Sequence, residues 1–272
     1  MPEQFTHLLL TRFNTSMAFA GSAKRLDSDW LTARLALFEQ YCFPSVAAQS
    51  CTNFHWFVFF DAASPAWFKQ RISRFTPLLT PIFIDGPVTD ELIARKVQET
   101  NLVSSPYLIS TRLDNDDAIS KDHLGLVQSA FCHQRRQFLT FPFGLQSFHG
   151  HLYKVYWPSN PFLSLIEKVN DNGQFTTVFC VPHDHVSDSN KLRKLWRSCH
   201  WLQTLHGSNV SNALRGWPRL SSRSHPNFDV TWPQCAPNDS IASRVRFSAA
   251  SYFARAMNFL SRTTTRQTCR TR

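Results

Sequence analysis

The first half of the chain alternates short apolar runs with stretches in which apolar residues recur at helical spacing. Four of the runs have the length of a buried strand: residues 7–13, 54–61, 81–85 and 107–113. Ser28 or Asp29 can cap a helix after the first run, and Pro44 ends, kinks or restarts that helix. Thr89 can cap another helix before the fourth run. Strands separated by helices predict right-handed crossovers and a mostly parallel α/β sheet flanked by helices.

After residue 130 the pattern becomes less regular. Strand-like runs occupy residues 137–143, 151–157 and 175–181, with short connections between them. Residues 160–168 have the apolar spacing of a helix. This half of the chain is therefore predicted to be α+β in character.

Acidic residues stand directly after three of the predicted strands. Asp61 closes the second run, Asp85 closes the third, and a cluster beginning at Asp114 follows the fourth. Ligands of parallel sheets bind beyond the carboxyl ends of the strands. The sequence therefore predicts a ligand site at this edge of the sheet.

The cluster after the fourth run holds three carboxylates within four residues, at Asp114, Asp116 and Asp117. Three carboxylates so close repel one another unless a cation or hydrogen-bond donors neutralise them. Their oxygens suit Mn²⁺ or Mg²⁺, ions that also bind substrate phosphates. Such an ion would neutralise the charge that develops on a diphosphate leaving group.

The same cluster has plainer interpretations, and the residues alone leave them open. Asp and Asn are common in turns, and Asp117 can cap a helix that reaches Leu124. An EF-hand loop does not fit, because Ile119 stands where that loop needs Gly and Gly125 stands where it needs Glu.

Composition adds limits to the class of protein. The 272 residues are 43% hydrophobic, which predicts a packed core. No apolar run approaches the roughly 20 residues of a membrane helix. The first residues lack the pattern of a secretory signal, and the seven cysteines are scattered without a C-x-x-C pair. We therefore expect a cytoplasmic protein with neither a disulfide framework nor a zinc ribbon.

The net charge of +10 comes largely from the C-terminal tail, because no acidic residue follows Asp239. Within this tail, residues 241–260 place apolar side chains on one helical face and arginines along its flank. Such a helix can rest on the inner face of an anionic membrane, or pack onto the body of the protein. No nucleic-acid-binding motif accompanies the arginines, so nucleic acid is not an expected partner.

Several stretches of the chain resemble the bacterial putative rhamnosyl transferase family, which belongs to the glycosyltransferases of the GT-A fold. The D-x-D-D group after an apolar strand is part of this resemblance, as is the helix end before the strand that closes at Asp61. The matching stretches are residues 11–14, 37–45, 59–61, 111–117, 201–203 and 206–212. The resemblance implies an enzyme that moves a sugar from a dTDP- or UDP-type nucleotide donor to a saccharide acceptor.

The resemblance also implies a division of the chain. Residues 1–125 would form the nucleotide-binding half of a GT-A domain. Residues 126–215 would form the acceptor-binding and catalytic half, and residues 216–272 a basic C-terminal extension.

Roles at the sheet edge follow from the resemblance. The backbone at Thr11 and Arg12 would contact the nucleotide. Asp61 would hydrogen-bond the base, since a carboxylate accepts the ring N–H of uracil or thymine. Asp114 would face the ribose or a metal-bound water, and Arg112 would point to the diphosphate or to Asp61.

The metal site is also implied by the resemblance. Asp116 would ligate Mn²⁺ or Mg²⁺, while Asp117 would assist the metal or position hydroxyls of the donor. His206 would add a metal or diphosphate contact, because neutral imidazole suits Mn²⁺. With Asp114, these residues make up the predicted metal-ligand set.

Inverting transfer needs a base that removes the proton of the acceptor hydroxyl. Asp184 lies just beyond an apolar run, between His183 and His185, and is the predicted base, with Asp188 as the second choice. The His-x-His spacing is also compatible with a metal pair, since alternate residues of a strand share a face. A polar loop without catalytic role is equally compatible with these residues.

The resemblance therefore implies a metal-dependent, inverting glycosyltransferase with rhamnose as the sugar, and a lipid-linked glycan is among the candidate acceptors. Two other classes stay open. The first is a metal-dependent phosphoesterase that uses the aspartate cluster with His183 and His185. The second is a non-catalytic module that binds a membrane or polyanion through its arginine tail.

Overall fold

A seven-stranded mixed sheet forms the centre of the computed structural model. The structure describes residues 4–16, 22–186, 191–206, 214–216, 219–220, 222 and 224–232. The strands of the central sheet, in spatial order, are β10 (Leu192–Lys194), β6 (Arg136–Thr140), β9 (Ser164–Lys168), β4 (Tyr107–Arg112), β1 (Phe5–Arg12), β2 (His55–Asp61) and β3 (Leu79–Ile84).

Only β9 runs against its neighbours in this sheet. It pairs antiparallel with β4 and with β6, whereas the pairs β1–β2, β1–β4, β2–β3 and β6–β10 are parallel. The carboxyl ends of the six other strands therefore meet at one edge of the sheet. The predicted α/β fold with a mixed, mostly parallel sheet flanked by helices is confirmed, and the arrangement agrees with the GT-A fold expected from the resemblance.

A smaller, four-stranded sheet lies beside the first one. Its spatial order is β5 (Ala118–Ile119), β11 (Trp201–Leu205), β7 (Phe143–Phe148) and β8 (His151–Tyr156). Strand β11 pairs antiparallel with β5, just after the aspartate cluster, and parallel with β7. The later part of the chain is thereby brought next to the cluster.

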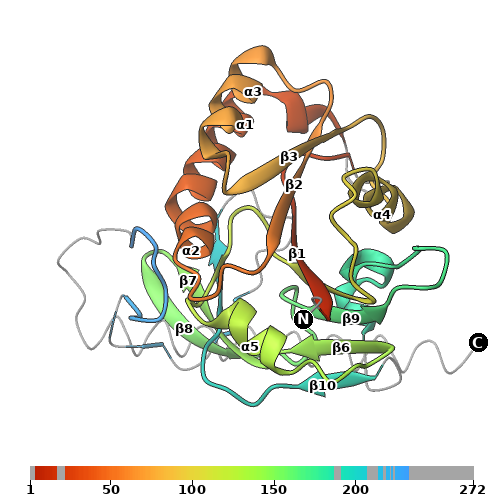
Figure 1. Cartoon of the computed structure of the whole chain (residues 1–272). Coiled ribbons are helices and arrows are strands. Elements are labelled where there is room, and N and C mark those ends of the chain that lie inside the picture. The colour runs from red at the N-terminus through yellow and green to blue at the C-terminus, as the bar shows by residue number, and fades with distance from the viewer. Residues whose placement is uncertain are drawn as a thin grey trace, which may run out of the picture.

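Helices cover both faces of the central sheet. They are α1 (Ser28–Leu37), α2 (Phe43–Ala47), α3 (Ala66–Ile72), α4 (Asp90–Gln98) and α5 (His123–Ser129). Short helical turns are η1 (Ser22–Leu26), η2 (Phe38–Cys42), η3 (Ser73–Phe75), η4 (Val178–Cys180) and η5 (His183–His185). Figure 1 shows α1, α2 and α3 on one side of β1–β3 and α4 on the other.

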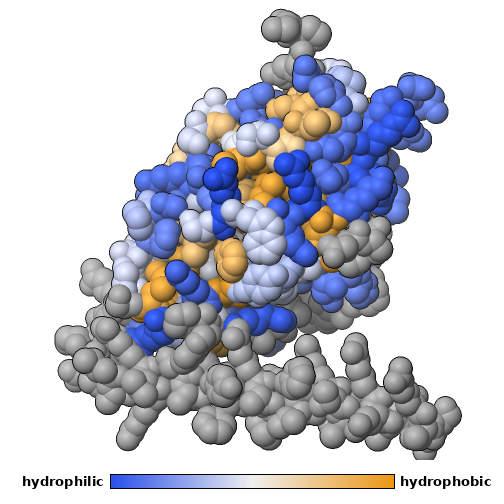
Figure 2. Space-filling model, turned by 90° about the horizontal axis from the view of Figure 1, so that it is seen from below, coloured by the Kyte–Doolittle hydropathy of each residue, from blue (hydrophilic) through white to orange (hydrophobic). Residues whose placement is uncertain are grey.

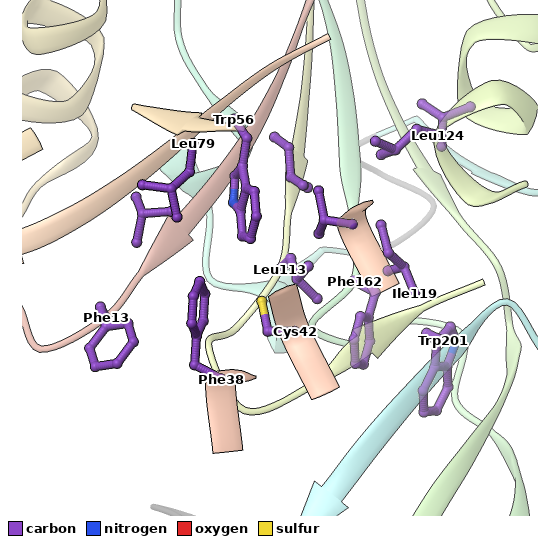
Figure 3. Packing of buried hydrophobic residues seen from close by; sticks show 14 of the residues in the cluster. Phe13, Phe38, Cys42, Trp56, Leu79, Leu113, Ile119, Leu124, Phe162 and Trp201 are labelled. Carbon is purple, nitrogen blue, oxygen red and sulfur yellow. The ribbon is translucent and has the colours of Figure 1, made fainter. Parts of the chain in front are cut away.

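The two sides of the sheet form two hydrophobic cores, and the alternation along β1 explains why. Leu9 packs into the core with α1, α3 and α5, while Leu8 and Leu10 pack into the core with α4. In the first core, Figure 3 shows Phe38 and Cys42 next to Trp56 and Leu113. All four side chains are buried, so the sheet edge rests on a rigid, close-packed base.

The helix after β1 begins at a different cap from those predicted. The side chain of Asp27, rather than Ser28 or Asp29, accepts from the backbone N–H of Trp30 at 2.9 Å. Pro44 restarts the helix, one of the three outcomes predicted for it. Because proline lacks an N–H, the backbone hydrogen bonds of the helix change to the π-helical pattern over Phe38–Cys42 before α2 begins.

Two predictions for the second half were wrong. Residues 160–168, predicted as a helix, contain strand β9, which fills the slot between β4 and β6 and buries both faces. Tertiary packing therefore overrides the helical spacing. Residues 175–181, predicted as a strand, contain only the short turn η4. Asp117 caps no helix, since the cap position of α5 is Asp122.

The proposed amphipathic helix at 241–260 and most of the basic extension lie outside the described residues. The described helices are all too short or too polar to span a bilayer. Strands from both predicted halves, 1–125 and 126–215, share the central sheet, and this division of the chain stays a prediction.

Candidate functional site

The predicted residues gather at the carboxyl edge of β1, β2 and β4. Backbone bonds extend the ladders past the strand ends, because Leu113 N–H donates to Leu10 O at 3.1 Å and Phe13 N–H donates to Phe59 O at 2.9 Å. Asn115 Nδ2 also donates to Phe13 O at 2.7 Å. The loops that carry the site are thus tied to one another, so their side chains start from fixed positions.

Asp61, the predicted base-binding residue, is buried at the end of β2 and already has several donors. Arg25 Nε donates to its Oδ2 at 2.7 Å, and the backbone N–H of Ala63 donates to its Oδ1 at 2.8 Å. Asn14 reaches the same corner, since its Oδ1 accepts from the backbone N–H of Asp61 at 3.2 Å and its Nδ2 donates to Ser64 Oγ at 2.9 Å. This corner is a preformed polar network between β1, β2 and η1.

Thr11 turns its side chain away from the edge. Its hydroxyl oxygen accepts from Trp56 Nε1 at 3.0 Å inside the core. Any contact of Thr11 with a ligand would therefore come from its backbone, as the resemblance implies.

Asp114 is held by the arginine two residues before it. Arg112 donates to both oxygens of this carboxylate, from Nε at 3.1 Å and from a terminal nitrogen at 2.7 Å. Burial alone would raise the pKa of Asp114, but the charge and hydrogen bonds of Arg112 and the charge of Arg12 hold it below its usual value. Arg112 is thus bonded to Asp114 and not to Asp61, and its predicted contact with the diphosphate stays a prediction.

Asp116 is shared by two basic side chains from distant parts of the chain. Arg34 of α1 forms an ion pair with its Oδ2, and His206 Nε2 lies 2.8 Å from the same oxygen. The guanidinium of Arg34 also lies 5.3 Å from the ring centroid of Trp30, one helical turn earlier. The structure thus brings together Asp116 and His206, two of the four predicted metal ligands.

Asp117 has a different environment from its neighbour. It is buried, and its Oδ1 accepts from the backbone N–H of Thr204 at 2.9 Å. Burial, together with the charges of Asp116 and Asp114, raises the pKa of Asp117 well above its usual value. The Thr204 hydroxyl bonds to the backbone oxygen of Asp116, so β11 fastens this part of the loop from both ends.

The donor set suits a divalent cation only in part. A carboxylate at Asp116 and an imidazole at His206 are ligands that Mn²⁺ or Mg²⁺ accepts when phosphates and waters complete its coordination. Across the described residues, no group of three or more His, Cys, Asp or Glu side chains is placed to hold a metal. A metal here would therefore take two ligands from these residues, and its presence stays a prediction.

Arg12 and Arg112 extend from the ends of neighbouring strands toward the same aromatic ring. The guanidinium carbon of Arg12 lies 4.5 Å from the centroid of Phe179, and that of Arg112 lies 5.7 Å from it. Burial and the charge of Arg112 lower the pKa of Arg12 to about 10, against the opposing effect of Asp114. The arginine stays charged at neutral pH, in a position that is electrostatically costly.

The predicted base lies on the turn η5. Asp184 is exposed there, and Asp188 lies outside the described residues. Its neighbour His183 is the group of this turn that interacts with Arg112 and Asp114. Burial first, then Arg112, lower the pKa of His183, with smaller opposing effects from Ser159, Asp114 and Asp184. The role of base stays a prediction for Asp184.

The histidine ring of His183 has a defined orientation. Its Nδ1 lies 3.2 Å from the backbone oxygen of Ser159, and its ring packs edge-on against Trp157 at 5.6 Å between centroids. A carbonyl oxygen only accepts, so Nδ1 carries the proton of the neutral ring. The lone pair is then on Nε2, which makes this imidazole competent to accept a proton.

Four residues of the site were missed by the sequence analysis as site residues: Arg25, Arg34, Phe179 and Ser159. None follows an apolar strand with an acidic neighbour, which was the pattern used to find the site. The sequence holds one clue to Arg34: Trp30 stands four residues before it on the same helix, so the two side chains are neighbours on one helical face. Phe179 gave none, since it stood in a run predicted as a strand.

One family of known proteins matches most of this chain. The family model described as "Putative rhamnosyl transferase" matches residues 6–217. Among curated proteins, none matches the chain.

Two solved structures illustrate the more distant likeness. The first is S. aureus TarS 1-349 in complex with UDP-GlcNAc, with 13% identity and a TM-score of 0.44 over 76% of this chain. The second, from Desulfovibrio desulfuricans G20, is described as a "putative nucleotide-diphospho-sugar transferase" and shares 10% identity, with a TM-score of 0.33 over 61% of this chain. The chain spans 60% of that TarS fragment and 63% of the second protein.

Proposed function

The chain belongs to the putative rhamnosyl transferase family and is a glycosyltransferase, and from this premise we propose that it transfers rhamnose from a nucleotide-diphosphate donor to a saccharide acceptor. The observation that carries the proposal is the set of carboxylates at the ends of β2 and β4, each held in place by an arginine. Ordered charges at the carboxyl edge of a parallel sheet are what a nucleotide diphosphate requires.

The nucleoside is proposed to bind at the corner of Asp61, Asn14 and Arg25. The polar network there supports this, because its groups can exchange a bond among themselves for one to the base or ribose. A carboxylate acceptor beside a pyrimidine ring N–H favours a dTDP- or UDP-type donor. The hydrogen-bonded loops would hold this corner in place before the donor arrives.

Asp116 and His206 are the residues that would hold a divalent ion, and such an ion would neutralise charge on the departing diphosphate. Arg34 is bonded to the same carboxylate and fixes its position. Its Nε is buried and has no hydrogen-bond partner among the described residues, so one donor of this guanidinium remains for a ligand.

For the proton of the acceptor hydroxyl we propose His183 as the receiving group, alongside the sequence prediction of Asp184. The support is the neutral ring with its lone pair on Nε2, near Asp114 and Arg112. The acceptor oxygen, freed of its proton by this base, would attack the anomeric carbon from the side opposite the leaving diphosphate and give inversion.

The acceptor is proposed to be a saccharide, and a group of exposed aromatic rings supports this. Phe143, Tyr156 and Trp196 follow or flank the carboxyl ends of β6 and β10, at the same edge as the charged site. Their ring centroids lie 5.3 to 6.4 Å apart, with Tyr156 and Trp196 stacked. Flat apolar rings with a polar tip suit the faces and hydroxyls of a sugar ring.

The test is transfer or slow hydrolysis of dTDP-rhamnose and UDP-sugars by the purified protein, with Mn²⁺, with Mg²⁺ and with EDTA. We expect turnover of at least one donor, and an Asp116→Asn variant should lose it. If no nucleotide diphosphate binds or reacts under any of these conditions, the proposal is wrong. Turnover of simple phosphate esters without nucleotide specificity would point to a phosphoesterase.

A further inference from the structure

We propose that Arg12 and Arg112, standing over Phe179, form the binding site for the diphosphate of the donor, with Arg12 as its principal cation. This inference rests on the proposed function and deepens it by assigning the group that binds the phosphates. The earlier expectation concerned only the backbone at Arg12, whereas the geometry points to its side chain.

Three arginines of the site are bonded to three aspartates, in the pairs Arg25–Asp61, Arg34–Asp116 and Arg112–Asp114. Arg12 breaks this pattern. Among the residues that the structure describes, no hydrogen bond or ion pair engages its guanidinium.

Asp114, the carboxylate whose charge acts on Arg12, is already bonded to another arginine. Both oxygens of Asp114 accept from Arg112, which leaves two guanidinium groups against one carboxylate. A half-buried cation without a partner costs free energy, and folded proteins rarely keep one that has no use. An anionic ligand that binds across both arginines would remove this excess of positive charge.

Phe179 determines where the two cations point. Its ring lies under both guanidinium groups, at 4.5 and 5.7 Å from their central carbons. A guanidinium that lies over a ring keeps its N–H donors in the plane, and those of Arg12 have no hydrogen-bond partner among the described residues, so they can form paired bonds with phosphate oxygens. The two arginines are therefore presented together rather than spread apart by their repulsion.

The turn that carries Phe179 is itself anchored to the sheet. The hydroxyl oxygen of Thr177 accepts from the Phe179 N–H at 3.3 Å, and the Thr177 N–H donates to Asp90 of α4 at 3.1 Å. The Val178 N–H donates to Ser110 Oγ of β4 at 2.9 Å. The ring is fixed relative to the strand that ends at Arg112, so the anion site is preorganised.

The position of this pair fits a diphosphate between a nucleoside and a sugar. Arg12 ends β1, with Asp61 at the end of β2 on one side and Arg112 at the end of β4 on the other. The proposed nucleoside corner at Asp61 thus lies beside Arg12, and the loop that carries Asp114 and Asp116 starts beside it, at the end of β4. A ligand with two linked phosphates has the negative charge that this middle position lacks.

The experiment measures binding of UDP, dTDP, uridine and thymidine by calorimetry, in Mn²⁺ and in EDTA. We expect Arg12→Gln to weaken binding of the diphosphates at least tenfold under both conditions, while nucleoside binding stays within twofold of wild type. Arg12→Lys should recover part of the loss, because it keeps the charge but not the paired geometry. Arg74→Gln, at an exposed arginine of η3, is the matched control and should bind as wild type does.

Thermal unfolding without ligand separates a binding role from a structural one. Removing an unpaired cation beside Arg112 should leave the unfolding midpoint of Arg12→Gln equal to or above that of wild type. The inference is overturned if this variant binds UDP and dTDP as tightly as wild type, or if it loses nucleosides and diphosphates alike with a lower midpoint. If wild type binds no nucleotide at all, the proposed function fails instead.

Discussion

The two ends of the carboxyl edge of the central sheet carry different kinds of side chain. At the ends of β1, β2 and β4 the side chains are ionic, and carboxylates are matched to arginines with bonds of 2.7 to 3.1 Å. At the ends of β6 and β10 the side chains are aromatic and exposed, with Trp196 at 62% and Tyr156 at 54%. We call these the charged end and the aromatic end.

Under the proposed function, the charged end would bind the donor and the aromatic end the acceptor. Electrostatic interactions are strongest where the charged groups are partly buried and held in place, which suits binding of a diphosphate. Exposed rings bind weakly but tolerate different partners, which suits a saccharide. Figure 2 shows the molecule from below, with apolar patches set among hydrophilic residues. Four predictions test the difference between the two ends.

The largest effect is expected where the charged end keeps a buried ion pair. Asp116→Asn leaves Arg34 without its counter-charge, with only 12% of that arginine side chain exposed. Loss of one partner from a buried pair costs about 3–5 kcal/mol. The neighbouring Asp117→Asn should cost less than about 1 kcal/mol, because a raised pKa favours a neutral carboxyl and Asn can still accept from Thr204.

Urea unfolding at pH 7 measures both variants under one set of conditions. If the two losses are equal, the division between a paired and a neutral aspartate is wrong. The comparison is well matched, since the residues are adjacent and the substitution is the same.

The second prediction concerns the turn η5, next to the charged end. His183→Asn should lower kcat by about 100-fold, the lower bound for removal of a general base. Asp184→Asn should change kcat less than about tenfold, because Asp184 is exposed. Steady-state kinetics with saturating donor gives both values. The reverse order of effects would favour Asp184, rather than His183, as the base.

Much of the charged end could be predicted from the sequence, because its chemistry follows strand ends. Asp61 and Asp114 stand where apolar runs stop, and the runs themselves match β2 and β4 within one residue. Short-range patterns thus gave both the elements and the positions of the acids. What they could not give was each acid's partner, since Arg34 lies 82 positions from Asp116.

The second half was harder to predict for a physical reason. Its elements depend on where they are inserted rather than on their own periodicity. Residues 160–168 have helical spacing, yet an antiparallel slot between β4 and β6 makes them a strand. The aromatic end was missed for a related reason, because Phe143, Tyr156 and Trp196 meet only after β7, β8 and β10 are in place.

The third prediction uses acid, since two histidines are fully buried. Burial and the charge of His123 lower the pKa of His7 on β1 to about 3. Burial lowers the pKa of His123 on α5, beside Phe141, to about 4, although the His200 carbonyl opposes this. Both rings are neutral in the folded protein and titrate near 6.5 when unfolded.

The sign of the effect follows from these values. Because the folded pKa is the lower one, the unfolded chain binds more protons below about pH 6.5, and stability falls as pH falls toward the folded pKa. Between pH 7 and pH 5 each histidine should cost about 2 kcal/mol. Urea unfolding of His7→Gln should show a shallower loss than wild type, while His55→Gln, at an exposed site, should follow wild type. Parallel curves for all three proteins would contradict this prediction.

The smallest effect is expected at the aromatic end. Trp196→Ala removes a ring that stacks on Tyr156 at 6.4 Å and is mostly exposed, so the free energy of unfolding should fall by less than about 1 kcal/mol. With any acceptor that supports transfer, the same variant should raise the acceptor KM several-fold and leave donor binding unchanged. Trp67→Ala, at an exposed tryptophan of α3, is the matched control and should change neither constant. An unchanged acceptor KM in Trp196→Ala would mean that the exposed rings are surface packing, and that only the charged end recognises a substrate.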